Sequence, residues 1–152
     1  MVERPHSVER LRGVERLRTP GRLGALGAVL ALVLALVTVN AIYGWLGLMA
    51  NGFGVPDDWL DRMPGHSWDF GAWALLLTVA LPQAVALVLV LRRHAWAGVF
   101  AYLVGAALIA WIVVQLAVLQ RYFVLQPVIA GLGGVEMVLA WLWTRPGART
   151  AG

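Results

Sequence analysis

Apolar residues dominate four long stretches of the chain, which polar residues separate. These stretches span residues 23–44, 71–91, 96–119 and 123–143. Each is close to the roughly 20 residues that an α-helix needs to cross a hydrocarbon core about 30 Å thick. Because the backbone polar groups inside a bilayer must be satisfied within the segment, each stretch is expected to be helical. The pattern therefore predicts an all-α integral membrane protein, an up-down four-helix bundle.

The polar segments define the expected domain organisation. Residues 1–22 are an Arg-rich N-terminal segment, residues 45–70 a loop between the first two spans, and residues 144–152 a tail, so that 23–143 form one bundle. The first apolar stretch exceeds the 7–15 apolar residues of a secretory signal, which favours an uncleaved anchor. Repeated Val-Glu-Arg triplets in residues 1–22 allow a short amphipathic helix on the membrane surface. Gly13 and the shortness of the segment favour a frayed basic tail instead.

Composition agrees with a bilayer environment and excludes several function classes. Hydrophobic residues make up 61% of the chain and charged residues 13%, far from the balance of a soluble globular domain. The absence of cysteine excludes disulfides, thiol redox chemistry and cysteine-based metal sites. All 12 basic residues are arginine, which, with the abundant Ala, Val, Leu and Gly, suggests a GC-rich bacterial genome.

The positions of the arginines predict the orientation, since positively charged residues near short loops remain in the cytoplasm. Most arginines precede the first span, join the second span to the third, or follow the fourth, whereas Arg62 and Arg121 fall on the other side. Both termini are therefore expected in the cytoplasm of a bacterial plasma membrane, with the 45–70 loop outside. Because topology explains the basic charge, nucleic-acid binding is not expected.

Four strongly polar side chains interrupt the predicted spans: Asn40, Gln83, Gln115 and Glu136. With a rise of 1.5 Å per residue, Gln83 lies about 3 Å and Glu136 about 5 Å to the cytoplasmic side of the span centres. Asn40 and Gln115 lie about 9–11 Å to the outer side. The sequence therefore predicts two polar layers, one near the middle of the bilayer and a second layer of Asn40 and Gln115 nearer the outside.

The inner layer contains the candidate site. An acid near the bilayer centre costs about 2.5–3.5 kcal/mol on insertion scales, so Glu136 should face the bundle and find a partner or remain protonated. Pro82 removes a backbone N–H from the second helix and leaves the Thr78 carbonyl without its helical donor, which predicts a kink there. Thr78, Gln83 and Glu136 are therefore the candidate intramembrane polar site. The alternative is that these groups only form structural hydrogen bonds between helices.

Small residues form strips on two of the predicted helices. Gly27, Ala31 and Ala35 lie on one strip of the first span. The third span carries a packing seam of which only the first half is small: Gly98, Ala101, Gly105, Leu108, Ile112 and Gln115. Such strips allow helices to approach closely, either within the bundle or at a contact with another membrane protein. The expected partners are thus the lipid bilayer, and with it another membrane protein or a second copy of the chain.

The 45–70 loop concentrates carboxylates and one histidine: Asp57, Asp58, Asp61, Asp69 and His66. Such a cluster could hold a divalent cation, but the spacing matches no recognised metal loop, and a solvated loop with Trp59 and Trp68 at the interface is favoured. We expect no metal site, no cofactor and no catalytic residue, because no nucleophile, zinc or phosphate-loop signature stands in a working context.

Several segments resemble a family of small bacterial four-span membrane proteins with no established activity. These segments are MPGHSWDFGAW before the second span, RRHAWAG between the second and third, WIVVQLAVLQRYFVLQP, and the Gly-rich fourth helix. The resemblance covers residues 50–143 and implies the four-span fold and a membrane location only. DoxX-like membrane proteins are a more distant comparison, by architecture alone.

The leading hypothesis for function is a non-enzymatic accessory or scaffold subunit of a membrane complex. The alternative is a small proton-linked transporter or carrier that uses Glu136 and Gln83. A membrane enzyme acting on lipid-like substrates ranks third, since it would need Glu136 or the outer aspartates as acid or base.

Overall fold

A computed structural model describes residues 24–55, 57–62 and 64–145 of the chain. The long helices are α2 (Ala25–Asn51), α5 (Ala97–Leu119) and α6 (Leu125–Thr144). A fourth is composite: α3 (Trp68–Leu75), the π-helical turn η4 (Leu76–Ala80) and α4 (Leu81–Leu91) form one continuous helix. All four are long and apolar enough to cross a membrane. The predicted all-α architecture with four membrane-spanning helices is thus confirmed, whereas the predicted N-terminal amphipathic helix (1–22) lies outside the described residues.

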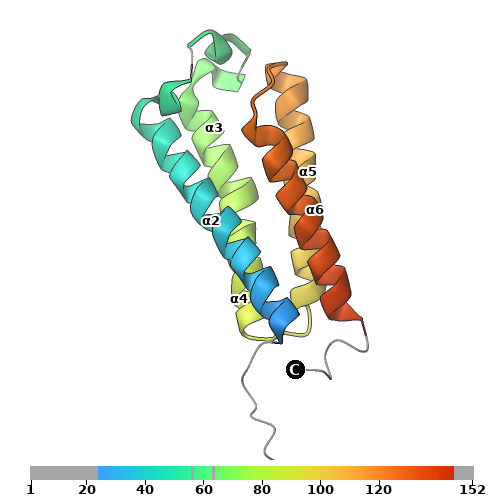
Figure 1. The fold of residues 1–152 in the computed structure, drawn as a ribbon. Helices are drawn as coiled ribbons and strands as arrows, with labels where there is room; N and C mark the ends of the chain where they lie inside the picture. The colour runs from blue at the N-terminus through green and yellow to red at the C-terminus, as the bar shows by residue number, and fades with distance from the viewer. Residues whose placement is uncertain (1–23, 56, 63, 146–152) are drawn as a thin grey trace, which may run out of the picture.

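The four helices form two antiparallel pairs (Figure 1). α2 packs against the composite α3–α4 helix, and α5 packs most extensively against α6. The start of α2, the α4–α5 connection and the end of α6 lie together at what we call the arginine end. The α2–α3 and α5–α6 connections lie at the opposite, loop end. Contacts of α2 with α6 and of α4 with α5 join the two pairs.

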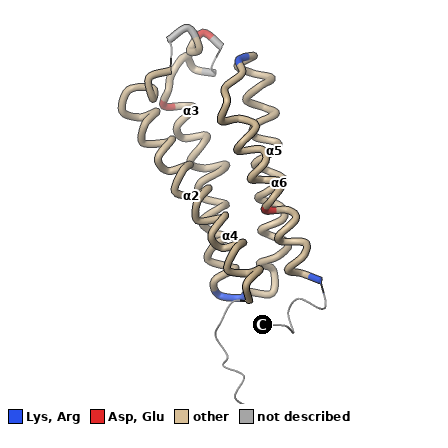
Figure 2. The backbone as a smooth tube through the Cα atoms, viewed as in Figure 1, with Lys and Arg blue, Asp and Glu red and all other residues tan. Residues whose placement is uncertain are grey.

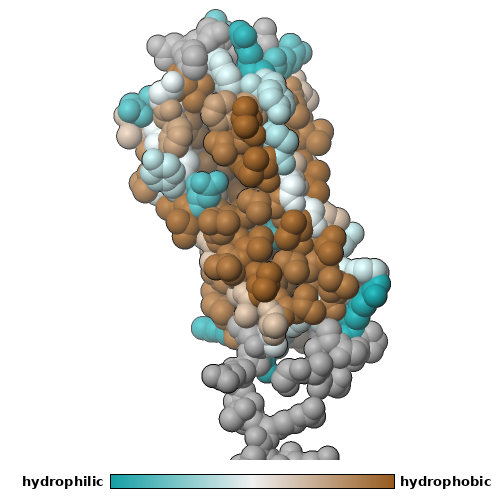
Figure 3. Space-filling model, in the orientation of Figure 1, coloured by the Kyte–Doolittle hydropathy of each residue, from teal (hydrophilic) through white to brown (hydrophobic). Residues whose placement is uncertain are grey.

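Apart from the buried Glu136, the described charged residues lie at the two ends of the bundle. Arg92, Arg93 and Arg145 lie at the arginine end, while Asp61, Asp69 and Arg121 lie at the loop end (Figure 2). Between these ends, most of the face seen in Figure 3 is apolar. Such an apolar band is what a hydrocarbon environment requires. The four apolar helices therefore indicate a multi-pass membrane protein.

The α2–α3 connection is more helical than the predicted loop over 45–70. α2 continues through the apolar residues 45–50 and ends at Asn51, because Gly52 takes a left-handed conformation (φ 68°) that suits glycine. Three short 3₁₀ turns follow, Gly52–Gly54, Asp57–Arg62 and Pro64–His66. Ser67 then caps α3, its hydroxyl oxygen accepting a hydrogen bond from the Asp69 backbone N–H at 3.1 Å. The segment outside regular helix is correspondingly short.

The irregularity expected at Pro82 takes the form of the π-helical turn η4. Proline at this position lacks an N–H, and its ring would clash with the Thr78 carbonyl in a regular α-helix. Widening the preceding turn relieves the clash: the Leu81 N–H donates to the Leu76 carbonyl, five residues back. The helix can thus continue past the proline.

Helices α5 and α6 approach each other closely at Gly105 of α5 and Gly133 of α6. A Cβ atom added to either glycine would lie 2.7 Å from the carbonyl oxygen of the other, which is closer than real Cβ contacts allow. Most of the predicted strip on α5 is buried, including Gly98, Ala101 and Gly105, and so are Gly27 and Ala31 on α2. Both small-residue strips therefore serve packing inside the bundle.

The glycine contact can be tested with two neighbouring substitutions. We expect Gly133→Ala to lower the free energy of unfolding by about 1–3 kcal/mol, since the added methyl group overpacks the contact. Gly134→Ala is the matched control, because nothing lies within 4 Å of its added Cβ, and alanine favours a helix by up to about 1 kcal/mol. SDS-titrated unfolding in mixed micelles, followed by circular dichroism, measures both. Equal stability of the two variants would contradict the contact.

Candidate functional site

Glu136 of α6 and Gln83 of α4 meet in the middle of the bundle. The Gln83 Nε2 donates a hydrogen bond of 2.8 Å to Glu136 Oε2. The exposed fraction of Glu136 is 0% and that of Gln83 is 1%. The structure thus brings together two of the three residues of the candidate site, and their bond links the two helix pairs.

Helical spacing places both side chains toward the core. Gln83 shares the buried side of α4 with Ala86 and Val90, and Glu136 shares the buried side of α6 with Gly133 and Ala140. These intervals of three, four and seven residues lie along one face of an α-helix. Gly105 makes room for the carboxyl group from the α5 side, since a Cβ added there would lie 3.1 Å from the Glu136 Cβ.

The pair leaves one oxygen of each side chain unused. Glu136 Oε1 and Gln83 Oε1 are both buried and have no hydrogen-bond partner. When Glu136 is ionised, both atoms are acceptors, so neither can satisfy the other. A protonated Glu136 would also offer a donor. The pair can therefore accept one proton without losing the observed hydrogen bond between Gln83 Nε2 and Glu136 Oε2.

Thr78 lies near this pair without joining it. Its hydroxyl donates to the Ala74 carbonyl of its own helix at 2.6 Å, and its side chain is exposed. The gap that Thr78 shares with Gln83 is also lined by Val79, Pro82, Val104 and Leu108, and has no room for a water molecule. The inner site therefore consists of Glu136 and Gln83 alone, closed off from water on this side.

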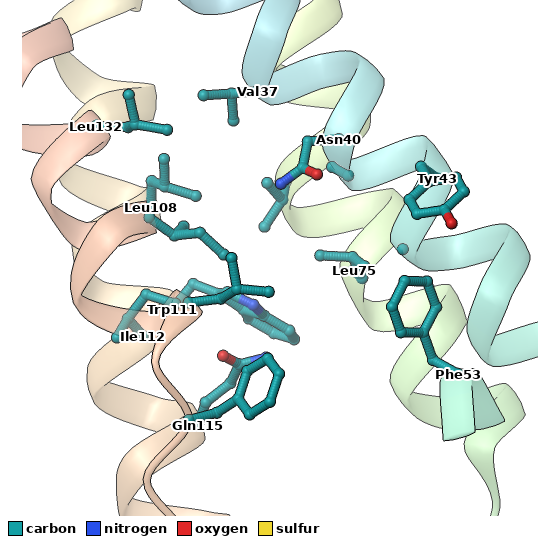
Figure 4. A pocket seen from close by; sticks show the side chains of 16 residues that line it. Val37, Asn40, Tyr43, Phe53, Leu75, Leu108, Trp111, Ile112, Gln115 and Leu132 are labelled. Atoms are coloured by element: carbon teal, nitrogen blue, oxygen red, sulfur yellow. The ribbon is translucent and has the colours of Figure 1, made fainter. Parts of the chain in front are cut away.

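The two residues predicted as a second polar layer, Asn40 and Gln115, both line a cavity of about 450 Å³ between the two helix pairs. Because α2 extends to Asn51, Asn40 lies only about 3 Å from the middle of its helix, deeper than predicted, whereas Gln115 lies about 10 Å from the middle of α5. Both amides point into the cavity, from α2 and α5 respectively, near Trp111 and Leu75 (Figure 4). Within the described part of the chain, neither amide has a hydrogen-bond partner. Transfer of an unpaired amide from water into hydrocarbon costs about 4–8 kcal/mol. The Gln115 side chain is half-buried, and that of Asn40 is exposed at the edge of the cavity.

A second cavity of about 420 Å³ adjoins the first. Leu75, Trp111 and Gln115 line both cavities, while Trp59, Trp68 and Phe70 contribute to the second. Trp59 and Trp68 therefore pack over the loop end of the bundle. No acidic or basic residue is among the described residues that line either cavity.

Two further polar residues, Gln126 and Thr38, are buried but were not predicted as site residues from the sequence. Gln126 shapes the turn before α6: its Oε1 accepts from the Phe123 N–H at 2.9 Å, and its Nε2 donates to the Arg121 carbonyl. The signal was the Gln-Pro pair at the start of the fourth span. Thr38 is buried on α2, where its hydroxyl donates to the Leu34 carbonyl at 2.7 Å. All three hydrogen bonds are local: the two of Gln126 lie in the turn before α6, and that of Thr38 lies within α2.

The histidine of the α2–α3 connection has a backbone partner. His66 Nδ1 lies 3.1 Å from the Leu60 carbonyl oxygen. Among residues 24–55, 57–62 and 64–145, no three His, Cys, Asp or Glu side chains are grouped as a metal ion would require.

Comparisons with protein-family models, curated proteins and solved structures gave no match to the chain. The resemblance to small four-span bacterial proteins therefore rests on the residues themselves.

The Glu136–Gln83 hydrogen bond predicts a specific pattern of stabilities. Gln83→Leu and Glu136→Leu each leave a buried polar group without its partner and should each lower the free energy of unfolding by about 1–3 kcal/mol. Glu136→Gln keeps an acceptor for Gln83 and should change the free energy of unfolding by less than about 1 kcal/mol. The double leucine variant should cost less than the sum of the single ones, because no partner is left unpaired. SDS-titrated unfolding of all four variants measures the coupling, and strictly additive losses would contradict it.

Proposed function

We propose that the chain is a non-enzymatic accessory or scaffold subunit of a membrane complex. The observation that carries this proposal is the Glu136–Gln83 pair. The carboxyl group is fully buried, hydrogen-bonded to an amide of the other helix pair, and next to a gap without room for water. A group in this setting stabilises the contact between helices, whereas an acid or base in a reaction must reach a substrate.

We propose further that the complex lies in a bacterial plasma membrane, with both termini in the cytoplasm. The all-arginine basic content supports a GC-rich bacterial source. Arg92, Arg93 and Arg145 at the arginine end, and Asp61 and Asp69 at the loop end, support this orientation.

The outward face of α6 supports a protein partner. A Cβ added to Gly131 or Gly134 would meet nothing within 4 Å. The neighbouring Val128, Val135 and Val138 are exposed. Small residues between exposed valines allow the backbone of a second helix to approach closely. The glycines that pack inside the bundle, Gly105 and Gly133, are already in contact with each other, whereas Gly131 and Gly134 remain accessible to a partner.

Copurification tests the accessory role. The tagged full-length protein, extracted in mild detergent from its native membrane, should retain a stoichiometric membrane protein that mass spectrometry identifies. Glu136→Gln should keep that partner, because the variant preserves the bundle. Gly131→Leu combined with Gly134→Leu should reduce the retained partner at least tenfold, since the larger side chains block close approach.

Ala110→Leu, at an exposed position of α5, is the control for the double glycine variant and should leave the partner in place. Recovery of the protein with no stoichiometric partner would overturn the accessory role.

A second candidate is a small proton-linked carrier that uses Glu136 and Gln83. One observation favours it: the two buried oxygens without partners give the pair an unused capacity for a proton. In liposomes with an entrapped pH-sensitive dye, a carrier would show proton flux that Glu136→Gln abolishes. Flux at the level of empty liposomes for the wild-type protein would exclude this candidate and leave the accessory role.

A further inference from the structure

The two helix pairs leave space between them near the loop end. The cavity of about 450 Å³ runs between α2 and α6, and exposed residues at its edge, Tyr43, Phe53 and Phe123, mark where it opens to the surroundings. Within a bilayer those surroundings are lipid. A volume of this size falls within the range of 300–1,000 Å³ that is typical of small-molecule sites.

The cavity walls combine apolar side chains with two amides. Asn40 and Gln115 are the strongly polar side chains of the wall, and neither has a hydrogen-bond partner within the described part of the chain. Each amide offers two N–H donors and a carbonyl acceptor. An occupant should therefore bring both a hydrocarbon portion and oxygen atoms that accept and donate hydrogen bonds.

The lining also indicates the charge of the occupant. No charged side chain is found among the described residues around either cavity. A phosphate or ammonium head group placed there would have no opposite charge to offset its desolvation. An uncharged head, by contrast, can be satisfied by the amides alone.

The depth of Gln115 matches the polar part of a glycerolipid. Asn40 lies deeper, about 3 Å from the middle of α2, whereas Gln115 lies about 10 Å from the middle of α5, toward the loop end. The hydrocarbon core extends about 15 Å to each side of the bilayer centre. The ester and hydroxyl oxygens of an uncharged glycerolipid lie at the edge of the hydrocarbon and can reach this depth with a small inward displacement. The Gln115 amide and the ester and hydroxyl oxygens of a glycerolipid can thus form hydrogen bonds at nearly the same depth in the bilayer.

Because a second cavity adjoins the first, an occupant with two hydrocarbon chains could fill both. Gln115 and Trp111 line both the 450 Å³ cavity and the 420 Å³ cavity. A head group bound at Gln115 could therefore direct one acyl chain into each cavity.

We propose that these two cavities bind diacylglycerol, with its glycerol and ester oxygens at Asn40 and Gln115 and one chain in each cavity. The proposal goes beyond the accessory role and depends only on the membrane location of the chain.

Photocrosslinking in purified vesicles tests the proposal. The full-length protein is reconstituted in phosphatidylcholine with a trace of diacylglycerol that carries a diazirine in one acyl chain, and mass spectrometry maps the crosslinks. Labelling should concentrate on cavity residues such as Leu75, Trp111 and Ile129. Excess unlabelled diacylglycerol should reduce this labelling at least fivefold, whereas the same excess of anionic phosphatidylglycerol should leave it unchanged.

Two pairs of variants sharpen the test. Ile129→Trp fills the cavity and should reduce labelling at least fivefold, while Val128→Trp, on the exposed side of α6 next to it, should have no effect. Gln115→Leu removes the shared amide and should abolish the advantage of unlabelled diacylglycerol over phosphatidylglycerol as competitor. Thermal unfolding in detergent establishes that each variant is folded.

The wild-type crosslinking map decides the question even if a cavity variant does not fold. Labelling spread evenly over exposed residues such as Val138, or competed equally by both lipids, would overturn the proposal, as expected for cavities filled by water or by another protein. Because no partner protein is present in these vesicles, the outcome is independent of the copurification result.

Discussion

The close approach of α5 and α6 at Gly105 and Gly133 is the contact on which the rest of the bundle depends. Helices in a bilayer gain no hydrophobic free energy from leaving lipid, so their association relies on close packing and interhelical hydrogen bonds. The two glycines allow the close packing, because a Cβ atom on either one would lie too close to the backbone carbonyl of the other. The position of Glu136 follows from this contact. It lies one helical turn beyond Gly133 and meets Gly105 through its Cβ, so the carboxyl group is directed away from lipid and toward Gln83.

The hydrogen bond from Gln83 then supplies the second kind of interaction, between the two helix pairs. Its location depends on Pro82, since the π-helical turn before the proline changes the face that the following residues of the helix present. Gln83, Ala86 and Val90 are buried after that turn. A regular helix through the same residues would rotate these side chains relative to α3. The proline and the glycines therefore act together to bring one amide and one carboxyl group within 2.8 Å.

The sequence predicted the spans and the meeting of Gln83 and Glu136 because both depend on one-dimensional information: apolar length and depth along a helix. It did not predict that Thr78 would form no hydrogen bond with Gln83 or Glu136. A threonine hydroxyl in a helix can donate to the carbonyl of the preceding turn, and only the fold decides which partner it takes. The length of α2 was underestimated because apolar residues 45–50 are equally compatible with an interfacial loop. The cavities could not be predicted, since they arise from the divergence of two helix pairs rather than from any segment. Gln126 could have been recognised from the Gln-Pro pair at a helix start.

The two polar layers differ in whether their side chains have hydrogen-bond partners, and the two proposals follow from this difference. At the inner layer the helices are in contact, so a carboxyl and an amide satisfy each other in part and leave no space for water. At the second layer the helix pairs are separated by cavities whose walls include Leu75 and Trp111, and the two amides have no partner among the described residues. A bundle stabilised only by helix packing would be expected to replace these amides with apolar residues, because unpaired amides in hydrocarbon are costly. Their presence beside an open cavity is explained if a further molecule supplies their hydrogen bonds, whereas the Gln83–Glu136 hydrogen bond of the inner layer holds the helices together without one.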